Sequence, residues 1–308
     1  MAVRAWIARC TAFGTLVCLS LAAVVPPARA EGVLERISSS GELRLVGRVD
    51  QPPLLVSERD GAPSGYGVVI AQRVADLLSQ AIGRPVRLRF EPVATDAQLD
   101  QRIRSGAAEL ACGVPFTWER DQTLDFSRPI ALSGLRLMAP AGRFGEDPAD
   151  LAGRRIGVVG GSLAETDLRG RQPAARIVTF PTLEAALVAL GGGQVEGVAG
   201  DSLLLRGLAR QLGLSGMALT PRQPFERYAF NCVMPEDASA FANLVNRAIV
   251  QFQQRYLDGE PAAVALVNRW FGPGSAVNLP PEAIRNLFDL LLTGVESLRP
   301  LAPAVPSR

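Results

Sequence analysis

The chain has 308 residues, of which 48% are hydrophobic and 20% charged, and this is typical of a globular protein of about two domains. It contains no histidine, and all 32 basic residues are arginine. These absences exclude a Ser-His-Asp triad, a Cys-His pair, an HExxH zinc site, a lysine Schiff base and a Walker-type phosphate loop. The net charge of +2 gives no case for nucleic-acid binding, and neither a metal nor a cofactor is expected.

Residues 1–30 have the composition of a secretory signal peptide. Arg4 and Arg9 precede an apolar run from Thr11 to Val25, and Ala28-Arg29-Ala30 is a small-x-small cleavage site. The run is too short to span a bilayer comfortably, so we expect export to the periplasm with cleavage after Ala30. Cleavage removes three arginines and no carboxylate, which changes the net charge from +2 to −1.

Cleavage would also leave two of the four cysteines, Cys112 and Cys232. In an oxidising compartment, two cysteines far apart in the sequence are a candidate disulfide. The alternative is a pair of buried thiols.

The first half of the remaining chain alternates between strand and helix patterns. Alternating residues predict strands at 43–47, 86–90 and 109–113. An apolar stripe at helical spacing predicts a helix over 70–81, and Leu99 with Ile103 predicts a shorter one. This order implies a mostly parallel sheet with helices on its faces.

The pattern then starts again. Strands are expected at 155–160, 176–180 and 195–199, with a helix at 183–190 before the Gly-rich turn. A crossover from the first unit is placed near Leu137–Ala141. Two similar α/β units usually enclose a ligand cleft between them.

The last third predicts two core-packing helices, over 241–256 and 284–295, because apolar residues recur on one face of each. The segment 300–308 is rich in Pro and Ala and has the composition of a disordered tail.

Three segments offer groups that bind a charged ligand. Thr117 is placed at the start of a helix, where it would cap free amides and bring Arg120 near them, and that suits a carboxylate. Ser162 follows a glycine turn at a second helix start. Asp201 ends an apolar strand, where ligands of α/β sheets bind. The structural alternatives are a tight turn at Gly160-Gly161 and a helix cap at Asp201.

Taken together, these motifs resemble family 3 of the extracellular solute-binding proteins, the periplasmic amino-acid-binding components of ABC importers. The resemblance covers roughly Leu34–Gly272. The segments that carry it are Leu43-Arg-Leu-Val-Gly47, Pro52-Pro53, Gly65-Tyr-Gly-Val68, Thr117-x-x-Arg120, Asp125-Phe-Ser-x-Pro129, Leu151-Ala-Gly-x-Arg155-Ile-Gly157-Val158, Gly161-Ser162, Asp201 and Asn268-Arg-Trp-Phe-Gly272.

The resemblance implies an α/β fold of the periplasmic-binding-protein type, with two lobes, a two-segment hinge and an interlobe cleft. The hinge crossings would be Leu137–Ala141 and Phe225–Phe230, and Cys112 would lie beside Cys232 because the returning strand pairs with the third strand. The implied organisation is a signal peptide at 1–30, lobe 1 with the C-terminal helices at 31–138 and 228–299, lobe 2 at 139–227 and a disordered tail at 300–308.

The resemblance also implies roles for site residues. Arg120, with Thr117 beside it, would hold the α-carboxylate of the ligand, and Asp201 would hold its ammonium group. Ser162 would close on the carboxylate from the second lobe, and Gln51 falls where many members place an aromatic ring over the ligand.

The chain departs from the family pattern at three positions. Pro115 stands where the family has a Thr or Ser whose N–H binds the carboxylate, Leu163 replaces a Thr after the Gly-Ser pair, and Val69 replaces an Asp. These departures remove two expected carboxylate contacts. A carbonyl or a water would then compensate, or the ligand would not be a plain α-amino acid.

We therefore expect a monomeric binding protein, not an enzyme, that delivers a small polar solute, an amino acid above all, to an ABC permease and its ATPase. One alternative is an exported enzyme that resembles cyclohexadienyl (prephenate or arogenate) dehydratases. The other is a ligand-sensing domain for a membrane partner.

Overall fold

The computed structural model describes residues 32–58 and 60–293. The expected signal peptide and the tail at 300–308 lie outside these residues. The helices are α1 (Val33–Ser40), α2 (Tyr66–Ile82), α3 (Asp96–Arg104), α4 (Leu163–Arg171), α5 (Leu183–Gly191), α6 (Ser202–Gln211), α7 (Ser239–Leu257), α8 (Pro261–Trp270) and α9 (Pro281–Leu292), with 3₁₀ turns η1 (Arg120–Gln122) and η2 (Pro148–Leu151). The strands are β1 (Glu42–Gly47), β2 (Asp50–Gln51), β3 (Leu55–Ser57), β4 (Pro63–Ser64), β5 (Arg87–Pro92), β6 (Ala111–Pro115), β7 (Leu124–Phe126), β8 (Ala131–Pro140), β9 (Arg155–Val159), β10 (Arg176–Phe180), β11 (Gly197–Asp201), β12 (Met217–Thr220) and β13 (Glu226–Pro235).

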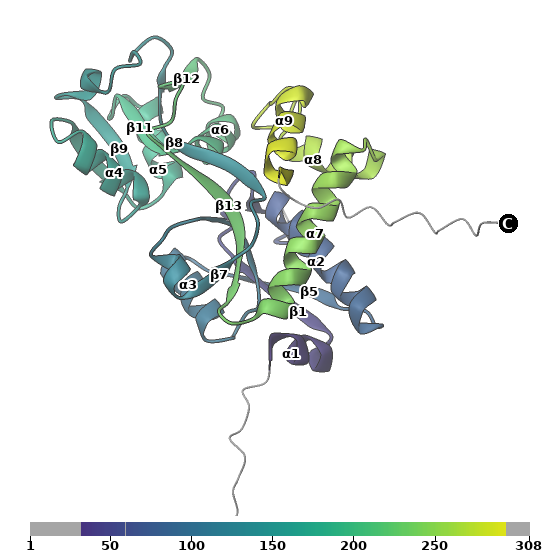
Figure 1. Ribbon diagram of the computed structural model, residues 1–308. Coiled ribbons are helices and arrows are strands. Elements are labelled where there is room, and N and C mark those ends of the chain that lie inside the picture. Colours follow the sequence, from purple (N-terminus) through teal and green to yellow (C-terminus); the bar gives the residue numbers. More distant parts are fainter. Residues whose placement is uncertain (1–31, 59, 294–308) are drawn as a thin grey trace, which may run out of the picture. The chain divides into compact units, whose positions relative to one another are not determined.

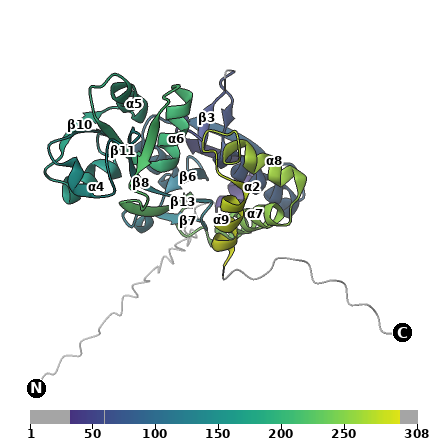
Figure 2. The same ribbon diagram turned by 90° about the horizontal axis from the view of Figure 1, so that it is seen from above.

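The elements form two groups, which we call the first lobe (β1–β7 with α1–α3 and α7–α9) and the second lobe (β9–β12 with α4–α6). Strands β8 and β13 run between them (Figures 1 and 2). The α/β architecture with two lobes that the sequence predicts is confirmed.

In the first lobe, β1 pairs in parallel with β5, and the Val46 amide donates to the Leu110 carbonyl just before β6. Helix α2 covers this sheet because Ile70, Val74 and Leu78 form one apolar stripe along it, and all three are fully buried. Gly83 ends the helix in the left-handed region, with a φ of 75°.

In the second lobe, β10, β9 and β11 are parallel, as the sequence predicts. Neighbouring residues of β11 face opposite sides of the sheet. Val198 packs with Leu187 and Leu208 of α5 and α6, while Ala199 packs with Leu168 of α4. Helices therefore cover both faces of this sheet. Because its three strands are parallel, their carboxyl ends meet at one edge.

The joined sheet is not mostly parallel, and this corrects the prediction from the β-α-β order. Its strand order is β10-β9-β11-β8-β13-β6, and the contacts of β8 and β13 with their neighbours are all antiparallel. The chain passes between the lobes once in each direction, so the two passing strands must run in opposite senses.

The two passing strands pair with each other over Ala131–Leu135 and Glu226–Phe230. The expected second crossing, Phe225–Phe230, overlaps this pairing. The expected first crossing, Leu137–Ala141, overlaps instead the part of β8 that pairs with β11 and β12.

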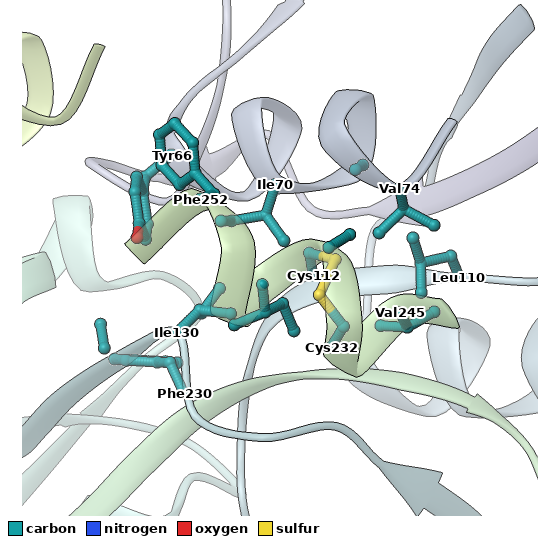
Figure 3. Packing of buried hydrophobic residues seen from close by; sticks show 14 of the residues in the cluster. Tyr66, Ile70, Val74, Leu110, Cys112, Ile130, Phe230, Cys232, Val245 and Phe252 are labelled. Atoms are coloured by element: carbon teal, nitrogen blue, oxygen red, sulfur yellow. A yellow bond between two sulfur atoms is a disulfide. The ribbon is translucent and has the colours of Figure 1, made fainter. Parts of the chain in front are cut away.

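A disulfide joins Cys112 of β6 to Cys232 of β13, with 3.9 Å between the Cα atoms. The two residues are register partners in the ladder, and both are buried. Figure 3 shows the bridge beneath Val74 of α2 and beside Val245 of α7. The bridge therefore lies inside the main core of the first lobe, under the two longest helices.

The C-terminal helices complete this core. Phe241, Val245, Ile249 and Phe252 bury one face of α7, and Phe288 of α9 packs edge-on against Tyr256. Within residues 32–58 and 60–293, every helix is too short or too polar to cross a bilayer.

Candidate functional site

A cavity of about 640 Å³ opens where the two lobes meet β8 and β13. Its walls come from both lobes, and it includes every site residue that the sequence analysis singled out. These are Gln51, Pro115, Thr117 and Arg120 on the first-lobe side and Ser162, Leu163 and Asp201 on the second-lobe side.

The turn that carries Arg120 differs from the predicted helix start. The Arg120 amide donates to the Thr117 hydroxyl at 3.2 Å, so the expected capping contact is present. However, the segment makes only the 3₁₀ turn η1 before β7 begins at Leu124, and the prediction of a helix after Thr117 is wrong. The chain must enter β7 to pair with β13, and this leaves no room for a longer helix.

The Arg120 guanidinium is held by two carboxylates of α3. Its Nε donates to Asp100 Oδ2 at 3.1 Å, and its Nη2 lies 3.2 Å from Asp96 Oδ2. Asp96 and Asp100 are four residues apart on a helix, so they share one face. The Arg120 side chain is only 14% exposed, so water solvates its charge weakly and the two carboxylates are its main electrostatic partners.

The ion pairs continue beyond Arg120. The other oxygen of Asp96 lies 3.2 Å from Nη1 of Arg48, and Nη2 of Arg48 lies 2.7 Å from Asp50 Oδ2. Burial lowers the pKa of Arg48, but the hydrogen bonds and charges of Asp50 and Asp96 outweigh it, and the pKa is raised overall. We call Asp50, Arg48, Asp96, Arg120 and Asp100 the first-lobe network.

Asp201 faces the cavity from the end of β11 and is 7% exposed. Its Oδ1 accepts hydrogen bonds from the amides of Leu203 and Leu204 at 2.8 and 3.0 Å. Asp201 therefore caps α6, which is the structural role that the sequence analysis gave as its alternative. Its Oδ2 accepts the Tyr228 hydroxyl at 2.6 Å. Burial raises the pKa of the Asp201 carboxyl, while the Tyr228 and amide hydrogen bonds oppose that shift.

The start of α4 forms the facing wall of the second lobe. Ser162 caps this helix, because its hydroxyl accepts the Glu165 amide at 3.3 Å. Glu165 also accepts the Gly161 amide at 2.7 Å. Leu163 follows at the first helical position and is 40% exposed, so it presents an apolar surface at the cavity.

Pro115 and Gln51 sit on the first-lobe side. Pro115 is the last residue of β6, where it is the register partner of Phe230. Its ring supplies no N–H at the point where the family pattern has one. Gln51 ends β2, and its carbonyl accepts the Leu54 amide at 2.8 Å, which closes the turn to β3.

Sequence reasoning missed four cavity residues. Asp96, Asp100 and Tyr228 contact the predicted residues Arg120 and Asp201, and Arg48 pairs with Asp96. A signal was present for Asp96 and Asp100, because their spacing of four on a short helix puts both on one face. Tyr228 lies in the expected second crossing, which should border any interlobe cleft. Nothing in the local pattern of Arg48 marks it.

Among residues 32–58 and 60–293, no group of three Cys, Asp or Glu side chains has an arrangement that could hold a metal ion.

Comparison with known proteins agrees with this geometry. The family model of the bacterial extracellular solute-binding proteins, family 3, matches residues 43–273. The L-cystine-binding protein TcyJ of Escherichia coli (strain K12) is 25% identical over 244 residues, which cover 79% of this chain and 87% of TcyJ. The virulence sensor protein BvgS of Bordetella bronchiseptica is 28% identical over 236 residues, which cover 75% of this chain but only 17% of BvgS.

Solved structures show the same fold. The crystal structure of the ancestral amino acid-binding protein AncCDT-1, described as a precursor of cyclohexadienyl dehydratase, aligns with a TM-score of 0.66 at 20% identity. The alignment covers 78% of this chain and all of AncCDT-1.

Proposed function

Because this chain belongs to the bacterial extracellular solute-binding proteins of family 3, we propose that it binds an amino acid in the cavity between its lobes and delivers it to an ABC importer. The observation that carries the proposal is the cavity itself. It places a guanidinium group of the first lobe and a carboxylate of the second lobe, Arg120 and Asp201, in one space large enough for such a ligand.

The available atoms suit a zwitterion. Asp100 and Asp96 occupy Nε and one N–H of Nη2 on Arg120, which leaves the edge formed by Nη1 and the second N–H of Nη2 for one carboxylate. The ammonium group would lie toward Asp201 and Tyr228. The start of α4 would cover the carboxylate from the other side, with the hydroxyl of Ser162 near it.

Closure of the cavity would come from a hinge in β8 and β13. We place it where these strands pair only with each other, at residues 132–134 and 227–229. Lobe 2 would then lie between these two segments of the chain. Ligand binding should bring the lobes together, as in other hinged binding proteins, and the function requires no chemical step.

We also propose that the protein works outside the cytoplasm, after cleavage behind Ala30, as a monomer that docks on a permease associated with an ATPase. The family is described as extracellular, and TcyJ, which aligns over 87% of its length, carries the name of a binding protein. Mass spectrometry of the exported protein should show Glu31 as its first residue.

A thermal-shift screen of the purified protein against the 20 amino acids and cystine tests the proposal. A ligand at 100 times its Kd should stabilise the fold by about 2.7 kcal/mol. Calorimetry on Arg120→Ala should then show a loss of affinity of at least about tenfold for the best ligand.

The matched control is Arg255→Ala, because the Arg255 side chain is 53% exposed, pairs with Glu260 on the protein surface and does not line the cavity. It should bind as the wild type does. Absence of any stabilising amino acid, or equal binding by Arg120→Ala and the wild type, would contradict the proposal.

The similarity to BvgS favours a second candidate, a ligand-sensing domain that signals to a membrane partner. The two functions would share the cavity and differ in the partner. Affinity capture from the native host, with ligand present, should recover a permease under the first proposal and a membrane-bound kinase under the second.

A further inference from the structure

Charge within the cavity is unevenly distributed. Its lining holds three guanidinium groups and five carboxylates, contributed by Arg48, Arg104, Arg120, Asp50, Asp96, Asp100, Glu119 and Asp201. A site built to bind an anion would have the opposite excess.

The pairing within the first-lobe network strengthens this bias. Its five members alternate in sign along one line of contacts, from Asp50 through Arg48, Asp96 and Arg120 to Asp100, at 2.7 to 3.2 Å per contact. Three carboxylates therefore compensate two guanidinium groups. Neither Arg48 nor Arg120 retains an uncompensated positive charge for a ligand.

Asp100 is the least accessible carboxylate of this network. Its side chain is 16% exposed, its Oδ2 accepts from Arg120, and its Oδ1 is buried without a hydrogen-bond partner among the described residues. Water can screen it only weakly, so its charge acts on a ligand in the cavity more strongly than an exposed carboxylate would.

The remaining guanidinium group does not restore the balance. Arg104 lies in the last turn of α3 and is exposed, so water screens its charge. Glu119, beside Arg120 in the chain, is exposed as well, so water screens its charge too and the balance is set by the first-lobe network and Asp201.

We infer that Asp96 and Asp100 determine the ligand specificity of the cavity: by occupying Arg120 they select amino acids whose side chain is cationic and reject those whose side chain carries a second carboxylate. This inference rests on the proposed function. A zwitterion can still place its α-carboxylate on the open edge of Arg120. A second carboxylate would meet Asp96 or Asp100 without a free cation, whereas a cationic side chain would gain a partner there.

Two pairs of ligands with matched shape isolate the charge. L-Glutamine and L-glutamate differ by one negative charge, and L-arginine and L-citrulline differ by one positive charge. Calorimetry should show that the wild type binds glutamine about tenfold or more tightly than glutamate, and arginine about tenfold or more tightly than citrulline.

The isosteric variant Asp96→Asn/Asp100→Asn removes the two charges and keeps the side-chain shapes. Both ratios should fall by about tenfold or more, because Arg120 then has an uncompensated charge. Asp76→Asn is the control, since Asp76 pairs with Arg73 on α2 and does not line the cavity, and it should leave both ratios unchanged. Thermal unfolding of each variant verifies that it is folded.

The possible failures are separable. Binding of glutamate as tight as that of glutamine by the wild type, or ratios that the double variant leaves unchanged, would overturn the specificity inference and leave the proposed function standing. If neither these four ligands nor any other amino acid binds the wild type or the double variant, the proposed function fails and the inference fails with it.

Discussion

The Tyr228 hydroxyl donates to Asp201 Oδ2 at 2.6 Å, and this bond ties the strand that returns from the second lobe to the cap of helix α6. Both side chains face the cavity; Asp201 is buried and Tyr228 is half-buried. Tyr228 therefore supports the carboxylate that we expect to bind the ligand ammonium group, and it does so from a strand that borders both lobes.

Removal of this hydroxyl should destabilise the fold. In Tyr228→Phe, Asp201 keeps its amide partners but loses the Tyr228 hydroxyl as a donor, so we expect a loss of about 1–3 kcal/mol in urea unfolding. Tyr66→Phe is the matched control, because the Tyr66 hydroxyl is buried with no hydrogen-bond partner among the described residues. That substitution should be neutral or stabilising, and equal losses in the two variants would refute the argument.

Asp201 should also make the stability depend on pH. Its pKa is raised in the folded chain by burial, so between the unfolded value of about 3.9 and the folded value the folded chain binds the proton more strongly. The stability that this group contributes is present below the unfolded value and is lost as the pH rises through the folded one.

The variant Asp201→Asn isolates this contribution, because asparagine can still cap α6 and can donate to the Tyr228 oxygen. The unfolding free energy of the wild type minus that of Asp201→Asn should fall as the pH is raised from about 3.5 to 7. A difference that grows over this range would show that the carboxyl pKa is lowered, not raised.

The disulfide should contribute substantially to stability. It closes a loop across a sequence separation of 120 residues, and this lowers the conformational entropy of the unfolded chain. Loss of the bridge restores that entropy and so favours unfolding. We expect Cys112→Ala/Cys232→Ala to lose about 3–5 kcal/mol of unfolding free energy relative to the oxidised wild type. Dithiothreitol should lower the unfolding free energy of the wild type toward that of the double variant and leave the variant unchanged. An unfolding free energy of the wild type that is the same with and without the reductant would argue against a bridge.

A close contact between the lobes predicts the effect of a single methyl group. A Cβ on Gly207 of α6 would lie 2.7 Å from the Pro52 carbonyl oxygen of the first lobe. Gly207→Ala should therefore push α6 away from the β2–β3 turn and destabilise the fold by about 1–3 kcal/mol.

Gly170→Ala is the control for helix propensity, because Gly170 lies in α4 with no atom within 4 Å of the added Cβ. It should stabilise the fold by about 0.5–1 kcal/mol. Unfolding in urea measures both variants, and a stable Gly207→Ala would mean that the lobes are not in contact at this point.

Much of the local structure follows from the sequence because it depends on short-range periodicity. The stripe of Ile70, Val74 and Leu78 predicts α2, and the strand expected at 176–180 has the bounds of β10. The ThrxxArg segment and Asp201 locate both sides of the cavity, since each lies at the end of an element that the pattern delimits.

Tertiary structure alone decides how the charges are paired and which strands join the lobes. Arg120 meets Asp100 across 20 residues of chain, a contact that exists only because η1 packs beside α3. In the same way, β13 inserts between β8 and β6, and this turns a sheet expected to be mostly parallel into a mixed one. Local sequence predicts which groups a segment carries, whereas their partners depend on the path of the whole chain, and the free energy of a charge depends on those partners.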